Sequence, residues 1–289
     1  MLTALVRTAR PTQWLKNVLV FAAPVAAGVL DQGRELGLTI AVFFAFCAAA
    51  SGIYFWNDLL DIEADRKHPA KRTRPLPSGV LSVGAARVAG VVLPVVALAL
   101  AAIPGNWETV AVVATYIVLT VLYSIWLKHV AVLDLLTIAA GFVLRAAGGA
   151  AAVEVHMSRW FVLCITFGSL FIVVGKRYAE LNEIGHEAGT RATLQSYSPS
   201  FLRMLLTASL AGTLISYCVW ALDHAESDST DLPLYELSIV PMLAALMRYL
   251  LLLDQGHGGA PEEVFADDRV LQLLGASWIL VYGLAGYTA

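Results

Sequence analysis

Long apolar stretches recur along the whole chain, and this recurrence constrains the fold more than any other feature. A helix that crosses about 30 Å of hydrocarbon needs roughly 20 apolar residues, because each residue advances the helix by about 1.5 Å. No block of soluble composition separates the stretches, so we expect one all-α, polytopic membrane domain over residues 1–289, with about nine transmembrane helices. The predicted spans are 12–30, 37–60, 80–102, 107–127, 131–150, 158–180, 202–222, 236–253 and 271–288.

Composition supports a membrane protein and narrows the kinds of site. The chain is 58% hydrophobic and 14% charged, with a mean hydropathy of +0.72, whereas a soluble domain carries about 25% charged residues. Its three cysteines lie far apart within predicted spans, and its six histidines are scattered singly. We therefore predict no histidine or cysteine metal site. We also expect no nucleic-acid partner.

The positive charges predict the orientation. If the N-terminus is cytoplasmic, every Lys and Arg except Arg34, Arg145 and Arg159 falls in a cytoplasmic segment. The loop at 223–236, which carries acids and no Lys or Arg, then lies outside. By the positive-inside rule we expect a multi-pass protein of the plasma (inner) membrane, with its N-terminus and its active site on the cytoplasmic side.

An acidic motif ends the second predicted span. Asn57, Asp61 and Asp65 recur every four residues and Asp58 precedes Asp61 by three, so a continuous helix would place them on one face. Clustered carboxylates at a membrane helix end need a cation or water, and Mg²⁺ prefers oxygen ligands together with substrate phosphates. The motif predicts a Mg²⁺ site, with Mn²⁺ as an alternative ion. Simple ion pairing of the acids with the bases at 66–74 is the other interpretation.

Basic residues at the cytoplasmic ends of other predicted helices favour an anionic substrate. Lys16, Lys128, Lys176 and Arg177 could converge with the acidic motif on one cavity that stabilises a departing pyrophosphate. Arg145, inside the fifth span, is either a substrate ligand or a structural ion pair. The Tyr123 hydroxyl could bind a sugar or a phosphate. Alternatively, Tyr123 could anchor its helix at the membrane interface. Motifs of P-loop enzymes, serine hydrolases, zinc proteases and dinucleotide-binding proteins are absent from the sequence.

These residues resemble the UbiA-type intramembrane prenyltransferase superfamily. The segment NDLLDIEAD (57–65) matches its NDxxDxxxD motif and is followed by KRTRP (71–75). Most members carry a second acidic motif on helix six, where this chain has GKRYAEL (175–181). That segment, together with RPTQWLKN (10–17), GSLF (168–171) and RVLQLL (269–274), is similar to the branch of actinobacterial decaprenyl-phosphate phosphoribosyltransferases.

The resemblance implies transfer of 5-phosphoribosyl from 5-phosphoribosyl 1-pyrophosphate to decaprenyl (polyprenyl) phosphate, with release of pyrophosphate, for arabinan and cell-wall synthesis. It also implies that the nine helices surround a central cavity open to the cytoplasmic side. Three groups of site residues follow from the resemblance. The metal ligands would be Asn57, Asp58, Asp61 and Asp65. The pyrophosphate would be met by Lys71, Arg72 and Lys128, with Asp58, Asp61, Lys71 and Arg72 as the catalytic set. Arg74 would be a further substrate contact. The other substrate contacts would be Gln13, Lys16 and Asn17 for the lipid phosphate, Lys176, Arg177 and Tyr178 for the 5-phosphate, Glu180 for those bases or the ribose hydroxyls, and Tyr123 and Arg145.

Two other functions stay open from the sequence. An ordinary UbiA-type enzyme would move a prenyl group from its pyrophosphate to an aromatic or other acceptor, although the bases at 176–177 argue against it. A transporter could also place charges in membrane helices, but it leaves the NDxxDxxxD motif unexplained. The chain would lie among membrane lipids, and the small-residue stretch 146–151 would permit helix contacts in a homo-oligomer.

Overall fold

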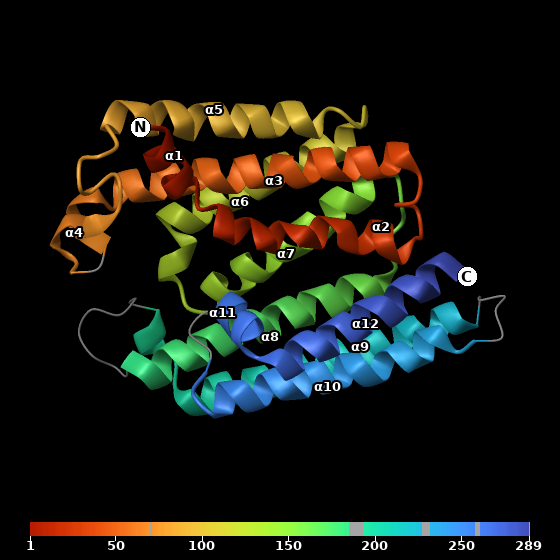
Figure 1. The fold of residues 1–289 in the computed structure, drawn as a ribbon. Helices are drawn as coiled ribbons and strands as arrows, with labels where there is room; N and C mark the ends of the chain where they lie inside the picture. The colour runs from red at the N-terminus through yellow and green to blue at the C-terminus, as the bar shows by residue number, and fades with distance from the viewer. Residues whose placement is uncertain (70, 185–192, 227–231, 258–260, 289) are drawn as a thin grey trace. The chain divides into compact units, whose positions relative to one another are not determined.

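The computed structural model describes residues 1–69, 71–184, 193–226, 232–257 and 261–288. All regular elements in these ranges are helices (Figure 1). In chain order they are α1 Leu2–Ala9, η1 Pro11–Phe21 (a 3₁₀ helix), α2 Ala22–Ala26, α3 Gly33–Leu60, α4 Ile62–Lys67, η2 Lys71–Thr73, α5 Val83–Ala101, α6 Trp107–Ile125, η3 Leu127–His129, α7 Leu133–Ala152, α8 Arg159–Ile184, η4 Leu194–Ser196, α9 Pro199–Ala225, α10 Leu234–Asp254, α11 Pro261–Asp267 and α12 Arg269–Thr288.

Within the described ranges, eight helices are long and apolar enough to cross a membrane: α3, α5, α6, α7, α8, α9, α10 and α12. They confirm the prediction of an all-α polytopic protein and match the last eight predicted spans. The first predicted span, 12–30, differs in kind, because η1 and the short α2 replace one long α-helix. A 3₁₀ helix rises about 2.0 Å per residue, so residues 11–26 still extend by roughly 30 Å. The count of nine spans stays a prediction.

The described chain forms two compact units. The first comprises residues 1–24, 29–125 and 144–156, and the second comprises residues 25–28, 126–143 and 157–289. Because each unit is defined by itself, the predicted convergence of all charged helix ends on one cavity stays a prediction. The membrane orientation also stays a prediction, and Arg191 and part of the acidic loop lie outside the described residues.

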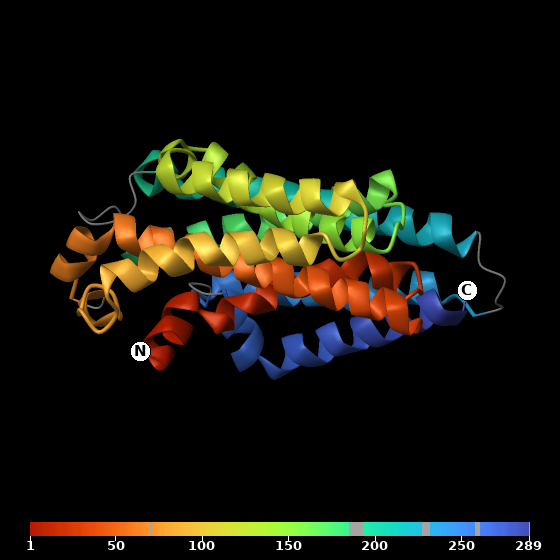
Figure 2. The ribbon, with the colours of Figure 1, turned by 90° about the horizontal axis from the view of Figure 1, so that it is seen from above.

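In the first unit, α3 and α5 lie side by side (Figure 2) and interlock through two glycines. A Cβ on Gly52 of α3 would lie 2.6 Å from Cδ of Pro94, the proline inside α5. In the opposite direction, a Cβ on Gly90 of α5 would lie 2.9 Å from Nε1 of Trp56. That indole nitrogen donates a 2.9 Å hydrogen bond to the Gly90 carbonyl. Each helix therefore inserts a ring where the other has no side chain.

The small-residue stretch of α7 packs inside the first unit. A Cβ on Gly148 would lie 2.5 Å from the ring of Phe46, and Gly149 faces the backbone carbonyl of Val20 even more closely. Ala146 and Ala150 are buried as well. The interpretation of this stretch as an exposed face for contacts between subunits is therefore wrong. The predicted homo-oligomer itself stays untested.

The second unit is built on two helix pairs, α8 with α9 and α10 with α12 (Figure 1). Its interior holds an apolar cluster around Phe171, Leu202 and Leu253 and a separate aromatic cluster around Trp220. In the aromatic cluster, the Tyr217 hydroxyl lies 2.7 Å from Ser238 Oγ and accepts a 2.7 Å bond from Trp278 Nε1. Ser198 caps α9 by accepting a hydrogen bond from the Phe201 amide, which satisfies one of the free donors of the first turn.

The contact of Gly149 with backbone leads to a stability prediction. We expect Gly149→Ala to lower the free energy of unfolding by at least about 1–3 kcal/mol, because the new methyl group meets a carbonyl that cannot rotate away. Thermal unfolding in detergent measures the change. Gly37→Ala is the matched control, since that exposed helical glycine has open space around it and alanine favours a helix by about 0.5–1 kcal/mol. Equal melting temperatures for the two variants would contradict the packing described for α7.

Candidate functional site

The entry of the chain into η1 places Arg10 beside α3. Arg10 adopts a left-handed conformation (φ 52°, ψ 62°) and precedes Pro11, which disfavours the α-helical conformation in the residue before it. Ser51 of α3 fixes this turn from both sides, because its hydroxyl donates to the Ala9 carbonyl at 3.0 Å and accepts from Trp14 Nε1 at 3.1 Å. Helix α1 therefore ends where the Arg10 side chain can reach the end of α3.

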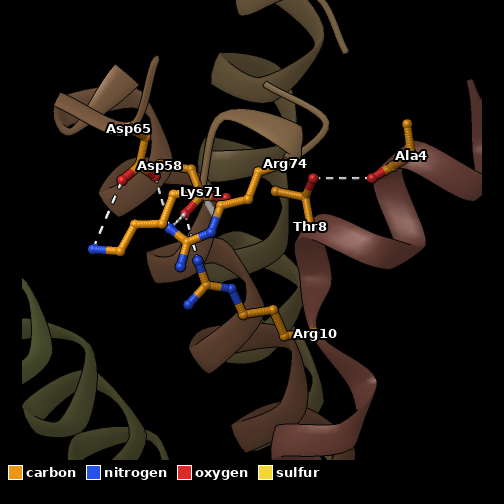
Figure 3. Close-up of polar contacts among 7 residues, drawn as sticks. All are labelled: Ala4, Thr8, Arg10, Asp58, Asp65, Lys71 and Arg74. Atoms are coloured by element: carbon orange, nitrogen blue, oxygen red, sulfur yellow. Dashed lines mark hydrogen bonds and ion pairs between the residues drawn. The ribbon is translucent and has the colours of Figure 1, made fainter. Parts of the chain in front are cut away.

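Arg10 joins a cluster of alternating charges (Figure 3). Its Nη2 donates to Asp58 Oδ1 at 2.5 Å, and its guanidinium stacks on the Tyr54 ring with 4.7 Å to the centroid. Arg74 Nη1 lies 2.7 Å from Asp65 Oδ2 and 3.7 Å from Asp58 Oδ1. Lys71 Nζ lies 3.9 Å from Asp65 Oδ1. The side chains of both aspartates are almost fully buried, so the neighbouring cations offset the cost of their charge.

The acidic motif keeps its four-residue repeat through a break in the helix. Helix α3 ends at Leu60, and Asp61 has a bridge conformation before α4 begins. The backbone bonds still run from the Asp61 amide to Asn57 and from the Asp65 amide to Asp61. The environments nevertheless differ, since Asp58 and Asp65 are buried and Asp61 is exposed. The side-chain oxygen of Asn57 is buried and has no hydrogen-bond partner among the described residues.

These side chains have the chemistry of a Mg²⁺ site without forming a complete cage. Within the described residues, no three His, Cys, Asp or Glu side chains are grouped closely enough to hold an ion alone. All the donors present are oxygens, and the Asn57 carbonyl and the exposed Asp61 carboxylate lack other partners in the described chain. Because Mg²⁺ is commonly held by one or two carboxylates, waters and substrate phosphates, this donor set fits the ion.

Two residues of η1 that the sequence predicts as substrate contacts differ in burial. Lys16 is half-buried and its Nζ donates to Gln13 Oε1 at 2.5 Å. Asn17 is fully buried, and its Oδ1 accepts a 2.7 Å bond from Arg145 Nε. Arg145 also donates to the Tyr116 hydroxyl at 2.8 Å and stacks on that ring. The intramembrane arginine thus contacts Asn17 and Tyr116 inside the first unit, and the predicted contacts of Asn17 and Arg145 with substrate stay predictions.

The remaining predicted residues of the first unit lie near the ends of its helices. Arg72 is exposed on η2, next to Lys71. Tyr123 is half-buried in the last turn of α6. Arg72 is thus the sequence neighbour of Lys71 in the charged cluster, and the predicted substrate contacts of Arg72 and Tyr123 stay predictions.

In the second unit, the bases of α8 occupy different environments. Arg177 is buried, with Nη1 2.7 Å from Glu180 Oε2 and Nε 3.4 Å from Asp134 Oδ2. Lys176 is half-buried and forms no ion pair with the described part of the chain. Tyr178 is buried, and its hydroxyl accepts a 3.3 Å bond from Arg203. Lys128 is half-buried on η3, where its backbone carbonyl accepts a 3.5 Å bond from Thr193 Oγ1.

The sequence interpretation missed four partners in these networks: Arg10, Tyr116, Asp134 and Tyr197. The position of Arg10, directly before a proline in the segment RPTQWLKN, gave a signal for a fixed turn. Asp134, in the first turn of a predicted span, gave another, because an acid in a membrane helix needs a partner. No local pattern marked the two tyrosines.

The Arg10–Asp58 pair leads to a second stability prediction. We expect Arg10→Gln to lower the free energy of unfolding by about 1–3 kcal/mol, because it removes a charged hydrogen bond from a buried carboxylate. Arg34→Gln, at a side chain that is 75% exposed, should change it by less than about 0.5 kcal/mol. Adding Asp58→Asn to Arg10→Gln should recover part of the loss in thermal unfolding. Strictly additive losses from the two substitutions would rule out the coupling.

Comparison with known proteins agrees with this architecture. Residues 18–266 match the model of the UbiA prenyltransferase family. A decaprenyl-phosphate phosphoribosyltransferase of Corynebacterium glutamicum is 41% identical over 98% of this chain and 86% of its own length. A protein of the same name from Mycobacterium tuberculosis is 38% identical over 99% of this chain and 95% of its own length.

A solved structure shares the fold. The UbiA homolog of Archaeoglobus fulgidus bound to GPP and Mg²⁺ superposes with a TM-score of 0.76 over 99% of this chain and all of that chain, at 19% identity. The similarity in sequence extends far beyond the acidic motif, and the resemblance inferred from the motifs is confirmed. This chain belongs to the UbiA prenyltransferase family.

Proposed function

We propose that this protein transfers 5-phosphoribosyl from 5-phosphoribosyl 1-pyrophosphate to decaprenyl phosphate and releases pyrophosphate. The observation that carries the proposal is the match over 98–99% of the chain to relatives named decaprenyl-phosphate phosphoribosyltransferase. The cationic segment on α8, where most members of the superfamily carry acids, supports the same assignment. The lipid product would supply arabinan precursors for the cell wall.

The first unit would stabilise the leaving pyrophosphate. In the reaction the bond between ribose C1 and the pyrophosphate oxygen breaks, so positive charge develops on the sugar and negative charge on the leaving group. Lys71, Arg72 and Arg74 lie together beside the acidic motif and carry the positive charge that such a group needs. Fixed cations stabilise this charge without reorganising during the reaction. We therefore assign the pyrophosphate to these three residues.

A divalent ion, Mg²⁺ or alternatively Mn²⁺, would be held by Asn57, Asp58, Asp61 and Asp65 together with the pyrophosphate oxygens. The buried Asn57 carbonyl and the exposed Asp61 carboxylate are the donors left for the ion, because guanidinium groups already contact Asp58 and Asp65. When bound, the ion would supply Lewis-acid neutralisation of the leaving group. The Archaeoglobus fulgidus homolog that binds GPP and Mg²⁺ supports the class of cofactor.

The acceptor needs positioning more than activation. A phosphate monoester is already an anion at neutral pH, so attack on C1 requires no general base. Lys16 and Gln13, which are hydrogen-bonded to each other on η1, are the proposed contacts for the lipid phosphate. The apolar helices would then accommodate its tail. This assignment places the reaction at the cytoplasmic side of the plasma membrane, where the basic residues of the sequence predict these helix ends to lie.

The second unit would recognise the rest of the donor. Lys176, which has no ion-pair partner in the described chain, is the proposed ligand of the 5-phosphate, with Lys128 as a second cation. Tyr178 is buried against Arg203, so we assign it to the wall of this region rather than to a direct contact. The half-buried Glu180 offers a carboxylate to the sugar.

The test uses purified protein in detergent or lipid with Mg²⁺, decaprenyl phosphate and radiolabelled phosphoribosyl pyrophosphate. We expect label in the organic phase from the wild type, and a loss of about 10²–10³-fold in Asp61→Ala, because one electrostatic contact to the leaving group is removed. Chelation of divalent ions should abolish transfer, and added Mg²⁺ should restore it.

Glu35→Ala is the matched control, since this acid lies at the opposite end of the same helix and should leave transfer unchanged. Absence of label together with transfer of a prenyl group from a polyprenyl pyrophosphate would replace the proposed function with ordinary prenyl transfer. Equal transfer by the wild type and Asp61→Ala would instead remove the acidic motif from the mechanism.

A further inference from the structure

A buried polar network in the second unit joins three segments that are distant in sequence. Asp134 lies in the first turn of α7, Arg177 lies on α8, and Tyr197 follows η4. All three are nearly inaccessible to solvent, with exposed fractions of 1%, 3% and 3%. Charged groups with so little solvent require exact partners, and the loss of one leaves the others at high cost.

Tyr197 links two of these segments through one hydroxyl group. It donates to Asp134 Oδ1 at 2.5 Å and accepts from the Val132 amide at 2.6 Å. Burial, and then the hydrogen bond to Asp134, raise the pKa of Tyr197 well above its ordinary value, so the phenol keeps its proton. It therefore remains a hydrogen-bond donor throughout the working pH range.

The turn that receives this hydroxyl is strained. Val132 has a φ of 70°, a left-handed conformation that β-branched residues rarely adopt. Thr193, four residues before Tyr197, contacts the carbonyl of Lys128 at the other end of the same turn. Strained backbone persists only where surrounding contacts hold it, and here residues 193–197 supply those contacts. The segment thus fixes the turn that carries Lys128.

The charges and the exposed fractions of these side chains indicate which residue of the network can contact a ligand. Arg177 contacts two carboxylates, so a phosphate placed against it would also lie near two negative charges. The exposed fraction of the side chains rises from 1% at Asp134 to 3% at Arg177 and 23% at Glu180. Glu180 is therefore the group that the network presents to a ligand. A carboxylate has several lone pairs and accepts hydrogen bonds from hydroxyl groups such as those of a sugar.

We propose that Asp134 and Tyr197 are positioning residues for the donor sugar, because they hold Arg177, which in turn presents Glu180 to the ribose hydroxyls. The inference rests on the proposed function, since it identifies the part of the donor that this network recognises. It also leaves Lys176, and not Arg177, as the cation for the 5-phosphate.

The experiment compares two donors in the organic-phase assay: phosphoribosyl pyrophosphate and its 2-deoxyribosyl analogue. The ratio of their kcat/KM values measures recognition of the hydroxyl. A site built to bind a hydroxyl rejects the analogue that lacks it, so we expect wild type to favour the ribosyl donor by at least about a hundredfold. Glu180→Ala should reduce this ratio at least tenfold, and Tyr197→Phe and Asp134→Asn should reduce it in the same direction. The KM for decaprenyl phosphate should not change.

Tyr217→Phe is the matched control. It removes the hydroxyl of another buried, hydrogen-bonded tyrosine of the same unit, and it should keep the wild-type donor ratio even if the melting temperature falls. An unchanged ratio in Glu180→Ala, or in folded Tyr197→Phe and Asp134→Asn, would overturn the inference while leaving transfer itself intact. If Tyr197→Phe does not fold, Glu180→Ala and Asp134→Asn decide the outcome. Absence of labelled product from the wild type would overturn the proposed function and the inference together.

Discussion

Burial of negative charge among apolar helices is the constraint on which the rest of this structure depends. Each buried carboxylate in the described residues lies beside a guanidinium: Asp58 beside Arg10, Asp65 beside Arg74, and Asp134 beside Arg177. An unpaired carboxylate would cost several kcal/mol in such surroundings, so each pair fixes the segments that supply its members. The pairs thereby bring α1 and η2 to the end of α3, and α7 to α8. Among the candidate site residues, Asp58, Asp65 and Arg177 are thus held by contacts that the fold itself requires.

The two units divide the proposed chemistry by charge. The first unit combines acids with several bases around an exposed helix end, which suits a metal and a pyrophosphate. In the second unit, Arg177 lies between two acids, an arrangement that suits neutral hydroxyl groups, whereas the half-buried Lys176 and Lys128 carry positive charge for a phosphate. A prenyl pyrophosphate has a leaving group for the first arrangement but no sugar hydroxyl for the second.

Much of this architecture could be predicted from the sequence, because hydropathy is a local property. Eight helices lie where apolar stretches place them, and the four-residue repeat of the acidic motif survives the break at Asp61. The helix type of residues 11–21 could not be predicted, since an apolar stretch does not distinguish a 3₁₀ helix from an α-helix. The partners of Asp58, Asp134 and Arg145 could not be predicted either. Each partner comes from another element, and packing alone decides which side chains meet.

The small residues of α7 were misinterpreted for the same reason. Composition does not show whether a helix face made of small residues packs against its own chain or against another copy.

The reciprocal insertion of Pro94 at Gly52 and of Trp56 at Gly90 has a mechanical consequence. Two helices that each hold a ring in the other's gap cannot slide by one turn, about 5.4 Å, without driving both rings into side chains. Helix α3 therefore has one allowed axial position against α5, and Asp58, near the end of α3, stays fixed relative to α5. This interlock makes α3 and α5 move together as one body. It also means that these four positions should change together during evolution, since a side chain gained at either glycine is tolerated only if the facing ring is lost.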